Sequence, residues 1–397
     1  MKARITMQRT RSTPCASKRL TLSLAIVFLL ALFPSQLDSG VRPLWPGAQY
    51  TQEDRDRAVE RGLQFVYKVA SNPEYFSRWG PDLMFCFYSI SSTARNQKLR
   101  EMALVMGQER ARQWRRDHTA VPADDPDDLA FFVYGTHSAD LLLGGYNPTL
   151  KNHVIEAIRR FSTVDFLSFD PRVEPPPSDI PEPCPKCNHR NPRGRQVCEK
   201  CGTALTFRSR YDVWLDSLIR THEGDAYGVT LGASYADALH WINTMRPYPA
   251  ASEDEASFDD VSYAVTHVVY TLNDYHRYRL SRSWLPQEFN YLKTNIAQAE
   301  SFDNGELTGE FMDALRAFGE DDGSPEIRTA MDYLLSTQNP DGSWGSMDDS
   351  DMYTRYHSTW TAIDGLRQYA FHATRLRLPR LKRLLQADNL PTGPAEH

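Results

Sequence analysis

The chain has 397 residues, a formal net charge of -6 at pH 7 and a pI near 6.0. A chain of this length can bury a sizeable core, as one large domain with a small module or as two ordinary domains, so its stability need not depend on disulfides. The acidic balance argues against nucleic acid as a main partner, because nucleic-acid-binding domains present a basic surface.

The N-terminus joins a basic leader to an apolar segment. Residues 1–19 contain Lys and Arg but no acid, and the apolar run 20–33 follows directly. This pattern predicts a membrane-targeting segment over residues 1–40, which is either a cleaved signal peptide or an uncleaved signal-anchor helix. In both cases the bulk of the chain lies outside the cytoplasm. We therefore expect a single-pass membrane protein, or a secreted or luminal protein after cleavage.

Beyond residue 50, apolar residues recur at helical spacing, and no alternating strand pattern rivals them. The sequence therefore predicts an all-α fold of paired helices. A segment rich in proline and cysteine at 174–206 divides the helical part into 50–173 and 207–380, and residues 381–397 form a tail. The predicted helical segments are 52–71, 94–116, 149–163, 209–220, 233–245, 261–280, 287–300, 307–318, 325–337 and 358–371.

An acidic run lies just before an apolar stretch that begins at residue 129. It reads Asp125-Pro126-Asp127-Asp128 and resembles the D-x-D-D acid motif of squalene-hopene-like and other class II terpene cyclases. The resemblance implies that Asp127 or Asp128 is kept protonated and donates a proton to an alkene inside an aromatic cavity. The alternative is an ordinary helix N-terminus, which Asp and Pro before an apolar run also predict.

Four of the six cysteines form two C-x-x-C pairs, Cys184 with Cys187 and Cys198 with Cys201. Four thiolates at this spacing can close a tetrahedron around zinc. The stretch resembles the zinc ribbon family with rubredoxin-like knuckles, which implies a structural zinc ion and an adaptor-like role. Two disulfides are the alternative, since a location outside the cytoplasm favours oxidation.

A repeat becomes visible in the spacing of the histidines. Thr-His occurs at His137, His222 and His267, and His357 follows a tyrosine. The step from His222 to His267 is 45 residues, and the step on to His357 is twice as long. The step from His137 to His222 becomes similar once the 174–206 insertion is removed. A period of 40 to 50 residues fits one helical hairpin per repeat.

A segment near the C-terminus resembles a known repeat. Residues 333–345 read Tyr-Leu-Leu-Ser-Thr-Gln-Asn-Pro-Asp-Gly-Ser-Trp-Gly and resemble the Gln-Trp repeat of terpene cyclases and the related turn of protein prenyltransferases. The stretch 356–366 resembles the start of the next inner helix in those families. The resemblance implies an α/α toroid of about six hairpins, in which the glutamine caps a helix and the tryptophan packs on its neighbour. It bears on the fold rather than on the reaction.

Polar groups at equivalent positions of such a repeat all face the central cavity. We therefore predict a catalytic metal site there, because imidazoles suit zinc, copper and iron and an open position leaves room for water or substrate. The predicted ligands are His137, His222, His267 and His357, with Glu223 or Glu310 as a carboxylate.

Three functions remain open from the sequence. The first is a membrane-associated metalloenzyme, with zinc in the ribbon, a second metal in the toroid and a small-molecule, lipid or isoprenoid substrate. The second is a class II cyclase-like enzyme that uses the acidic run. The third is a non-catalytic toroid that binds a partner through the ribbon.

Overall fold

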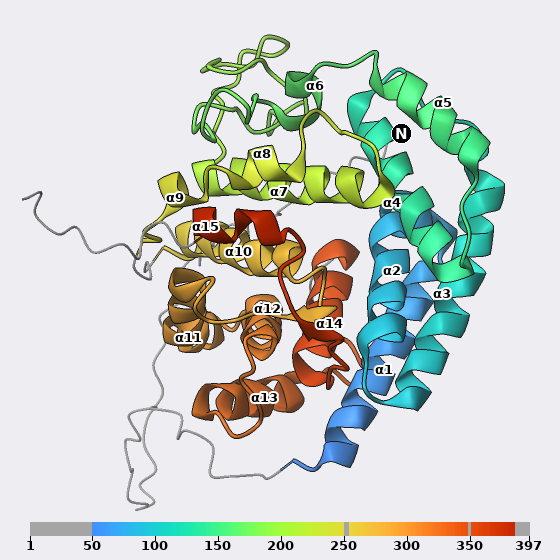
Figure 1. The fold of residues 1–397 in the computed structure, drawn as a ribbon, viewed down its shortest axis with the longest axis vertical. Helices are drawn as coiled ribbons and strands as arrows, with labels where there is room; N and C mark the ends of the chain where they lie inside the picture. The colour runs from blue at the N-terminus through green and yellow to red at the C-terminus, as the bar shows by residue number, and fades with distance from the viewer. Residues whose placement is uncertain (1–49, 250–253, 348–350, 386–397) are drawn as a thin grey trace, which may run out of the picture.

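The computed structural model describes residues 50–249, 254–347 and 351–385, so the predicted membrane-targeting segment 1–40 lies outside the described residues. Within these ranges helices are the main secondary structure (Figure 1). Strand structure there is confined to β1 (Tyr278–Arg279) and β2 (Ala373–Thr374), which form one short parallel pair. The all-α prediction is confirmed. In the part of the chain so described, no helix is both long and apolar enough to cross a membrane.

The longer helices are α1 (Gln52–Ala70), α2 (Pro73–Thr93), α3 (Gln97–Asp117), α4 (Pro126–Leu143), α5 (Pro148–Ile158), α7 (Arg210–Tyr227), α10 (Glu255–Leu272), α11 (Pro286–Ser301), α12 (Gly305–Ala317), α13 (Pro325–Thr337) and α14 (Met352–Leu366). Short helical turns connect them: α6 (Thr163–Leu167), α8 (Tyr235–Leu239), α9 (Ile242–Met245), η1 (Pro379–Leu381) and α15 (Lys382–Leu385).

Seven helices pack side by side in a closed order. α2 packs on α4, α4 on α7, α7 on α10, α10 on α12 and α12 on α14, and α1 connects α14 back to α2 (Figure 1). Other helices cover this set: α3 packs on α2 and α4, and α11 and α13 pack on α12. Each helix of the closed order therefore has neighbours on several sides.

Two helices of this set, α2 and α4, are missing from the predicted segments. α4 is apolar around most of its circumference, because α2, α3 and α7 surround it, and a helix buried on several sides shows no three-and-four stripe. The buried residues of α2 do recur at three-and-four spacing, but Pro81 and the non-helical backbone of Trp79 lie inside this helix. The predicted segment 261–280 is also too long, since α10 ends at Leu272 and an irregular loop follows.

The 174–206 segment leaves and rejoins the helical body at one place. The amide of Glu182 donates to the Thr206 carbonyl at 2.9 Å, and the amide of Arg208 donates to the Ile180 carbonyl at 2.9 Å. Ile180 is buried in an apolar cluster with residues of α4 and α6. The segment lies beside α6 at one edge of the molecule (Figure 1). Its two ends are thus held together as a short antiparallel pair.

The turn at 338–344 ties the end of the chain to its beginning. The amide group of Gln338 donates to the Ala58 carbonyl of α1 at 2.8 Å. The indole of Trp344 donates to the Leu334 carbonyl at 2.7 Å and is 1% exposed. A Cβ atom on Gly62 of α1 would lie 2.9 Å from this indole, so only glycine allows the contact without a shift. The turn therefore joins α13, α14 and α1.

We expect Trp344→Ala to lower the free energy of unfolding by about 3–5 kcal/mol, because it removes a fully buried indole at the junction of three helices. The control Tyr146→Ala, at a position 66% exposed, should change it by less than about 0.5 kcal/mol. Urea unfolding followed by circular dichroism measures both. Equal losses in the two variants would show that the indole does not hold this junction together.

Candidate functional site

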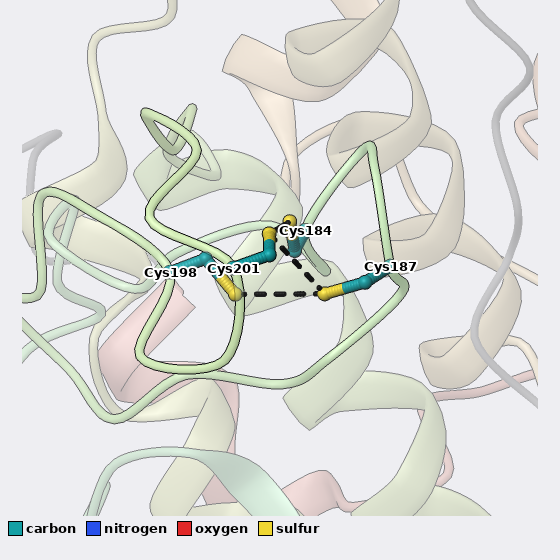
Figure 2. A group of neighbouring side chains, drawn as sticks. All are labelled: Cys184, Cys187, Cys198 and Cys201. Carbon is teal, nitrogen blue, oxygen red and sulfur yellow. Dashed lines mark hydrogen bonds between the residues drawn. The ribbon is translucent and has the colours of Figure 1, made fainter.

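Four cysteines of the 174–206 segment meet at one point, as Figure 2 shows. The Sγ atoms of Cys184 and Cys201 are 3.4 Å apart. Cys187 Sγ lies 3.6 Å from Cys198 Sγ and 3.5 Å from Cys201 Sγ. Two sulfurs of a disulfide are about 2.05 Å apart, whereas thiolates around one tetrahedral zinc ion are about 3.8 Å apart. The four cysteines form no disulfide, and the cluster can hold a metal ion.

Both cysteine pairs are bent into tight turns. Asn188 (φ 54°) and Gly202 (φ 72°) follow the second cysteine of each pair in the left-handed conformation, which asparagine and glycine adopt most readily. Their amides donate to the carbonyls of Cys184 at 2.7 Å and of Cys198 at 2.8 Å. The residues after each pair thus turn the chain so that all four thiols face one centre.

Asp127 joins this segment to the helical body. It lies at the start of α4, and its carboxylate pairs with Arg190 of the cysteine segment and, at 2.8 Å, with Arg220 of α7. Burial alone would raise the pKa of Asp127, but the two guanidinium groups outweigh it and lower that pKa. The carboxylate is therefore ionised, whereas a proton-donating acid has to be protonated. Asp125 is the N-cap of α4 and accepts from the amides of Asp127 and Asp128, as the alternative interpretation predicts.

We expect Asp127→Asn to lower the free energy of unfolding at pH 7 by about 2–3 kcal/mol, less than for a fully buried pair because Arg190 is half exposed. The native pKa is lowered, so this contribution is complete above the unfolded value of about 3.9 and is lost as the pH falls through the native value. Urea unfolding at pH 7 and at pH 3 measures it, with exposed Asp124→Asn as control. A difference between variants that is the same at both pH values would contradict the assignment.

A second cluster lies where α12 faces α14. His357 Nδ1 is 3.0 Å from Glu306 Oε1, and one ligand atom each of His357, Glu306 and Glu310 lies within 4.8 Å of the other two. Hydroxyl groups hold the carboxylates: Tyr263 donates to Glu306 at 2.7 Å and Thr266 donates to Glu310 at 2.6 Å. Glu306 and Glu310 are one helical turn apart, so they share a face of α12.

The imidazole of His357 is the unusual member of this cluster. The residue is 7% exposed, and its Nδ1 atom forms a 3.0 Å ion pair with Glu306 whose geometry falls short of a hydrogen bond. This ion pair offsets part of the cost of burying the imidazole.

The charges of the cluster are unbalanced. Burial would lower the pKa of His357, but the carboxylates of Glu306, Glu310 and Asp82 raise it to about 9. Burial and the Glu306 carboxylate raise the pKa of Glu310 to about 8. Burial also raises the pKa of Asp82, on α2. The site thus gathers more carboxyl groups than one imidazolium can keep ionised at neutral pH.

A cavity of about 340 Å³ opens among α2, α4, α7 and the loop after α10. Aromatic rings form one side of it, with Phe85 lying 4.9 Å from Tyr275 and 5.6 Å from Tyr134 between ring centres. Phe85 also contacts Trp360, which contacts His357. These rings therefore connect the cavity wall to the cluster on α12 and α14.

Three of the predicted residues line this cavity: His137, His222 and Glu223. Burial and the nearby Asp82 carboxyl raise the pKa of Glu223 well above its ordinary value, which favours its neutral form. Burial and the positive charge of Arg377 lower the pKa of His137 to about 4 and also lower the pKa of His222. Both imidazoles are therefore neutral at pH 7.

The loop after α10 has an unusual backbone. Asp274, Tyr275 and His276 are consecutive and have φ values of 59°, 46° and 71°. Such conformations are unfavourable for residues other than glycine, and they concentrate at functional sites. The loop puts Tyr275 and Asp274 into the cavity wall. It is a feature that helical periodicity does not reveal.

A third cluster, His276 with Asp313 and Asp364, is fully buried. His276 Nε2 lies 2.5 Å from Asp313. The buried guanidinium of Arg367 donates to Asp364 at 2.6 Å and to Thr93 at 2.8 Å. This cluster therefore already contains its own cation.

The four histidines predicted to share one metal are distributed over the site. Groups of three or more ligand atoms within 4.8 Å occur three times among the described residues, and no three of these histidines fall in one group. His357 joins Glu306 and Glu310, and His137 and His222 line the cavity. His267 is buried on α10, with its Nδ1 atom 2.9 Å from the Tyr263 carbonyl. The repeat identified polar positions of the interior, but it did not identify a common ligand set.

Several residues of the site were missed, namely Asp82, Tyr275 and Glu306. Asp82 is a lone acid in an apolar stretch, and Glu306 precedes Glu310 by four residues. Both are signals that the sequence contains. No family model, curated protein or solved structure matches the chain, so its function is argued from this geometry.

Proposed function

We propose that this protein is a metal-dependent enzyme whose catalytic cation is held by His357, Glu306 and Glu310 in the centre of an α/α toroid. The observation that carries the proposal is the convergence of one imidazole and two carboxylates at ligand spacing, with His357 Nδ1 3.0 Å from Glu306 Oε1. Two ligands of one cation at about 2.1 Å are about 3.0–3.4 Å apart, so a cation would satisfy both groups at this spacing.

The packing order of α2, α4, α7, α10, α12 and α14, which α1 closes, supports the toroid. The helices that alternate with them in the chain lie outside, as α3, α11 and α13 do. The hydrogen bonds of Gln338 and Trp344 join α13 to α1 and support the same interpretation of the 333–345 turn. On this proposal the cluster and the cavity both belong to the interior of the ring.

The three proposed ligands narrow the choice of metal. One imidazole and two carboxylates suit zinc or iron(II) better than copper, which takes soft or nitrogen-rich sites. The third cluster is a weaker candidate, because Arg367 already supplies positive charge there and all its members are fully buried. The side chain of Glu306 is 15% exposed, so the proposed site retains access.

The cation supplies Lewis-acid or water-activating chemistry when it is bound. The chain supplies the rest. Burial raises the pKa of Glu223 and favours its protonated form, from which it can donate a proton to a molecule in the cavity. The rings of Phe85, Tyr134 and Tyr275 offer an apolar wall, which suits a substrate with a hydrophobic body, such as a lipid or an isoprenoid. On this proposal Glu223, rather than Asp127, is the proton donor. In the cyclase-like alternative, too, Glu223 would take the role of the acid.

We further propose that the four cysteines bind a structural zinc ion and that the segment 1–40 brings the protein to a membrane, with its main domain outside the cytoplasm. The sulfur separations of 3.4–3.6 Å support the zinc ion. The binding of a partner through the ribbon stays a prediction.

Cobalt(II) tests the proposed catalytic site independently of the ribbon. In the variant Cys184→Ser, Cys187→Ser the thiolate site is removed, and we expect the chain to bind one cobalt ion with visible bands of oxygen and nitrogen ligation. Adding His357→Ala should abolish these bands, whereas exposed His153→Ala should not. Equal cobalt spectra with and without His357 would refute the proposal.

A further inference from the structure

The cavity has a second chemical feature that the metal site does not use. Its wall at the C-terminal ends of α4 and α7 carries His137 and His222, and the segment after α14 adds Arg377. Arg277, from the loop after α10, lies on the same wall. Basic groups from four separate parts of the chain therefore converge on one cavity.

Two of these groups have buried donors without a hydrogen bond among the described residues. They are Nε2 of His222 and Nη1 of Arg377. Both lie near Oδ1 of Asp274, at 3.9 Å and 3.6 Å, which is too far for a hydrogen bond. His222 is 5% exposed. Neither donor is within hydrogen-bond distance of the Asp274 carboxylate. Both are therefore available to an acceptor atom of a bound molecule.

The charge balance of this wall is positive. Arg277 lies 3.5 Å from Asp274 and Arg377 lies 3.6 Å from it, so one carboxylate faces two guanidinium groups. Asp225 also lies in the field of Arg377, but it accepts a hydrogen bond from the Tyr235 amide. Arg377 and Lys151 both act on His137 as positive charges. Burial raises the pKa of Glu223 well above its ordinary value, which favours its uncharged form.

The strained loop explains how this wall is built. The left-handed backbone at residues 274–276 places Asp274 between the two arginines and turns the Tyr275 ring toward Phe85 and His222, with ring centres 4.9 Å and 5.1 Å apart. Strain of this kind persists only when surrounding contacts hold it. The same loop thus forms a polar corner beside an aromatic surface.

We propose that this corner is a binding subsite for the anionic group, a carboxylate or a phosphate, of a small molecule whose apolar body lies on Phe85, Tyr134 and Tyr275. Arg377 forms the ion pair, and His222 and His137 donate hydrogen bonds. Arg277 lies at the open side, since its side chain is 50% exposed. If the protein is the enzyme proposed above, this molecule is its substrate. The subsite shares no residue with the metal ligands, so the two proposals can fail separately.

Probes with a phenyl body separate the two anion chemistries. We expect phenyl phosphate and 3-phenylpropionate each to bind the full-length protein at one site in isothermal titration at constant ionic strength, and benzyl alcohol to bind at least 10-fold more weakly. The tighter of the two anions identifies the head group. Binding of benzyl alcohol as tightly as both anions would overturn the subsite.

Substitutions in the cavity wall test whether the anions bind at the proposed subsite. Arg377→Gln should lower the affinity for the more tightly bound anion at least 10-fold, since a charged hydrogen bond contributes about 1.5–3 kcal/mol. Arg375→Gln is the matched control, because Arg375 is exposed and stacks on Tyr278. Arg277→Gln removes a half-exposed group of the same wall and should weaken binding about 3-fold without affecting folding. Unchanged affinity in both the Arg377 and the Arg277 variants would contradict the proposal, whatever the metal content of the protein.

Discussion

Replacing Cys184 and Cys187 together by serine is expected to unfold the cysteine segment while the helical body stays folded. The apolar cluster around the cysteines contains just Cys184, Cys198 and Leu205 as buried members among the described residues, which is too small a core to fold by itself. In zinc-finger peptides the metal contributes about 10–16 kcal/mol. The segment therefore depends on its four thiolates.

Limited trypsin digestion measures this effect. We expect the double variant to be cut at Lys186, Arg195 and Lys200 at least 10-fold faster than the unmodified chain, with the helical circular dichroism retained. Cys86→Ser is the control, because Cys86 is buried on α2 and lies outside the cluster. A double variant as resistant to trypsin as the control would show that no metal holds the segment.

The second large effect is expected at Glu310. Glu310→Gln removes the charge but keeps the shape, and we expect the affinity of the proposed toroid site for its cation to fall by more than 100-fold. Thr266→Val should give a smaller loss, about 10- to 100-fold, because Thr266 orients Glu310 through a 2.6 Å hydrogen bond. Competition with a chromophoric chelator measures both.

This graded pair separates ligation from packing. Thr266 is fully buried, and valine fills the same volume, so its effect reports on the orientation of the carboxylate. The exposed residue Glu101 offers Glu101→Gln as a control that should leave the affinity unchanged. Equal chelator competition in all three variants would remove Glu310 from the ligand set.

The sequence predicted the parts of this molecule that local chemistry determines. The two C-x-x-C pairs and Gly202 determine a turn geometry that brings four thiols together. Gln338 and Trp344 each make contacts across the 338–344 turn. Amphipathic helices on the outside, such as α3 and α13, followed their three-and-four pattern.

The predictions that were wrong or incomplete concern features that depend on long-range packing. α4 is buried on several sides, so its apolar residues show no stripe, and Pro81 interrupts the helical pattern of α2. Histidines at one repeat phase did not form one ligand set, although His137 and His222 line the same cavity. His357 instead met Glu306 and Glu310 across the α12 and α14 contact. The charged partner of Asp127 came from an insertion more than sixty residues away, which no local pattern indicates.

The number of metal ions per chain is the most direct test of the proposed function. Elemental analysis by mass spectrometry of the purified full-length protein should find two metal ions per chain, and one in His357→Ala, with two retained in the exposed control His153→Ala. The element lost with His357 is then the catalytic metal. One metal ion per chain in all three proteins, lost just when Cys184 and Cys187 are replaced, would contradict the proposed metal site at His357.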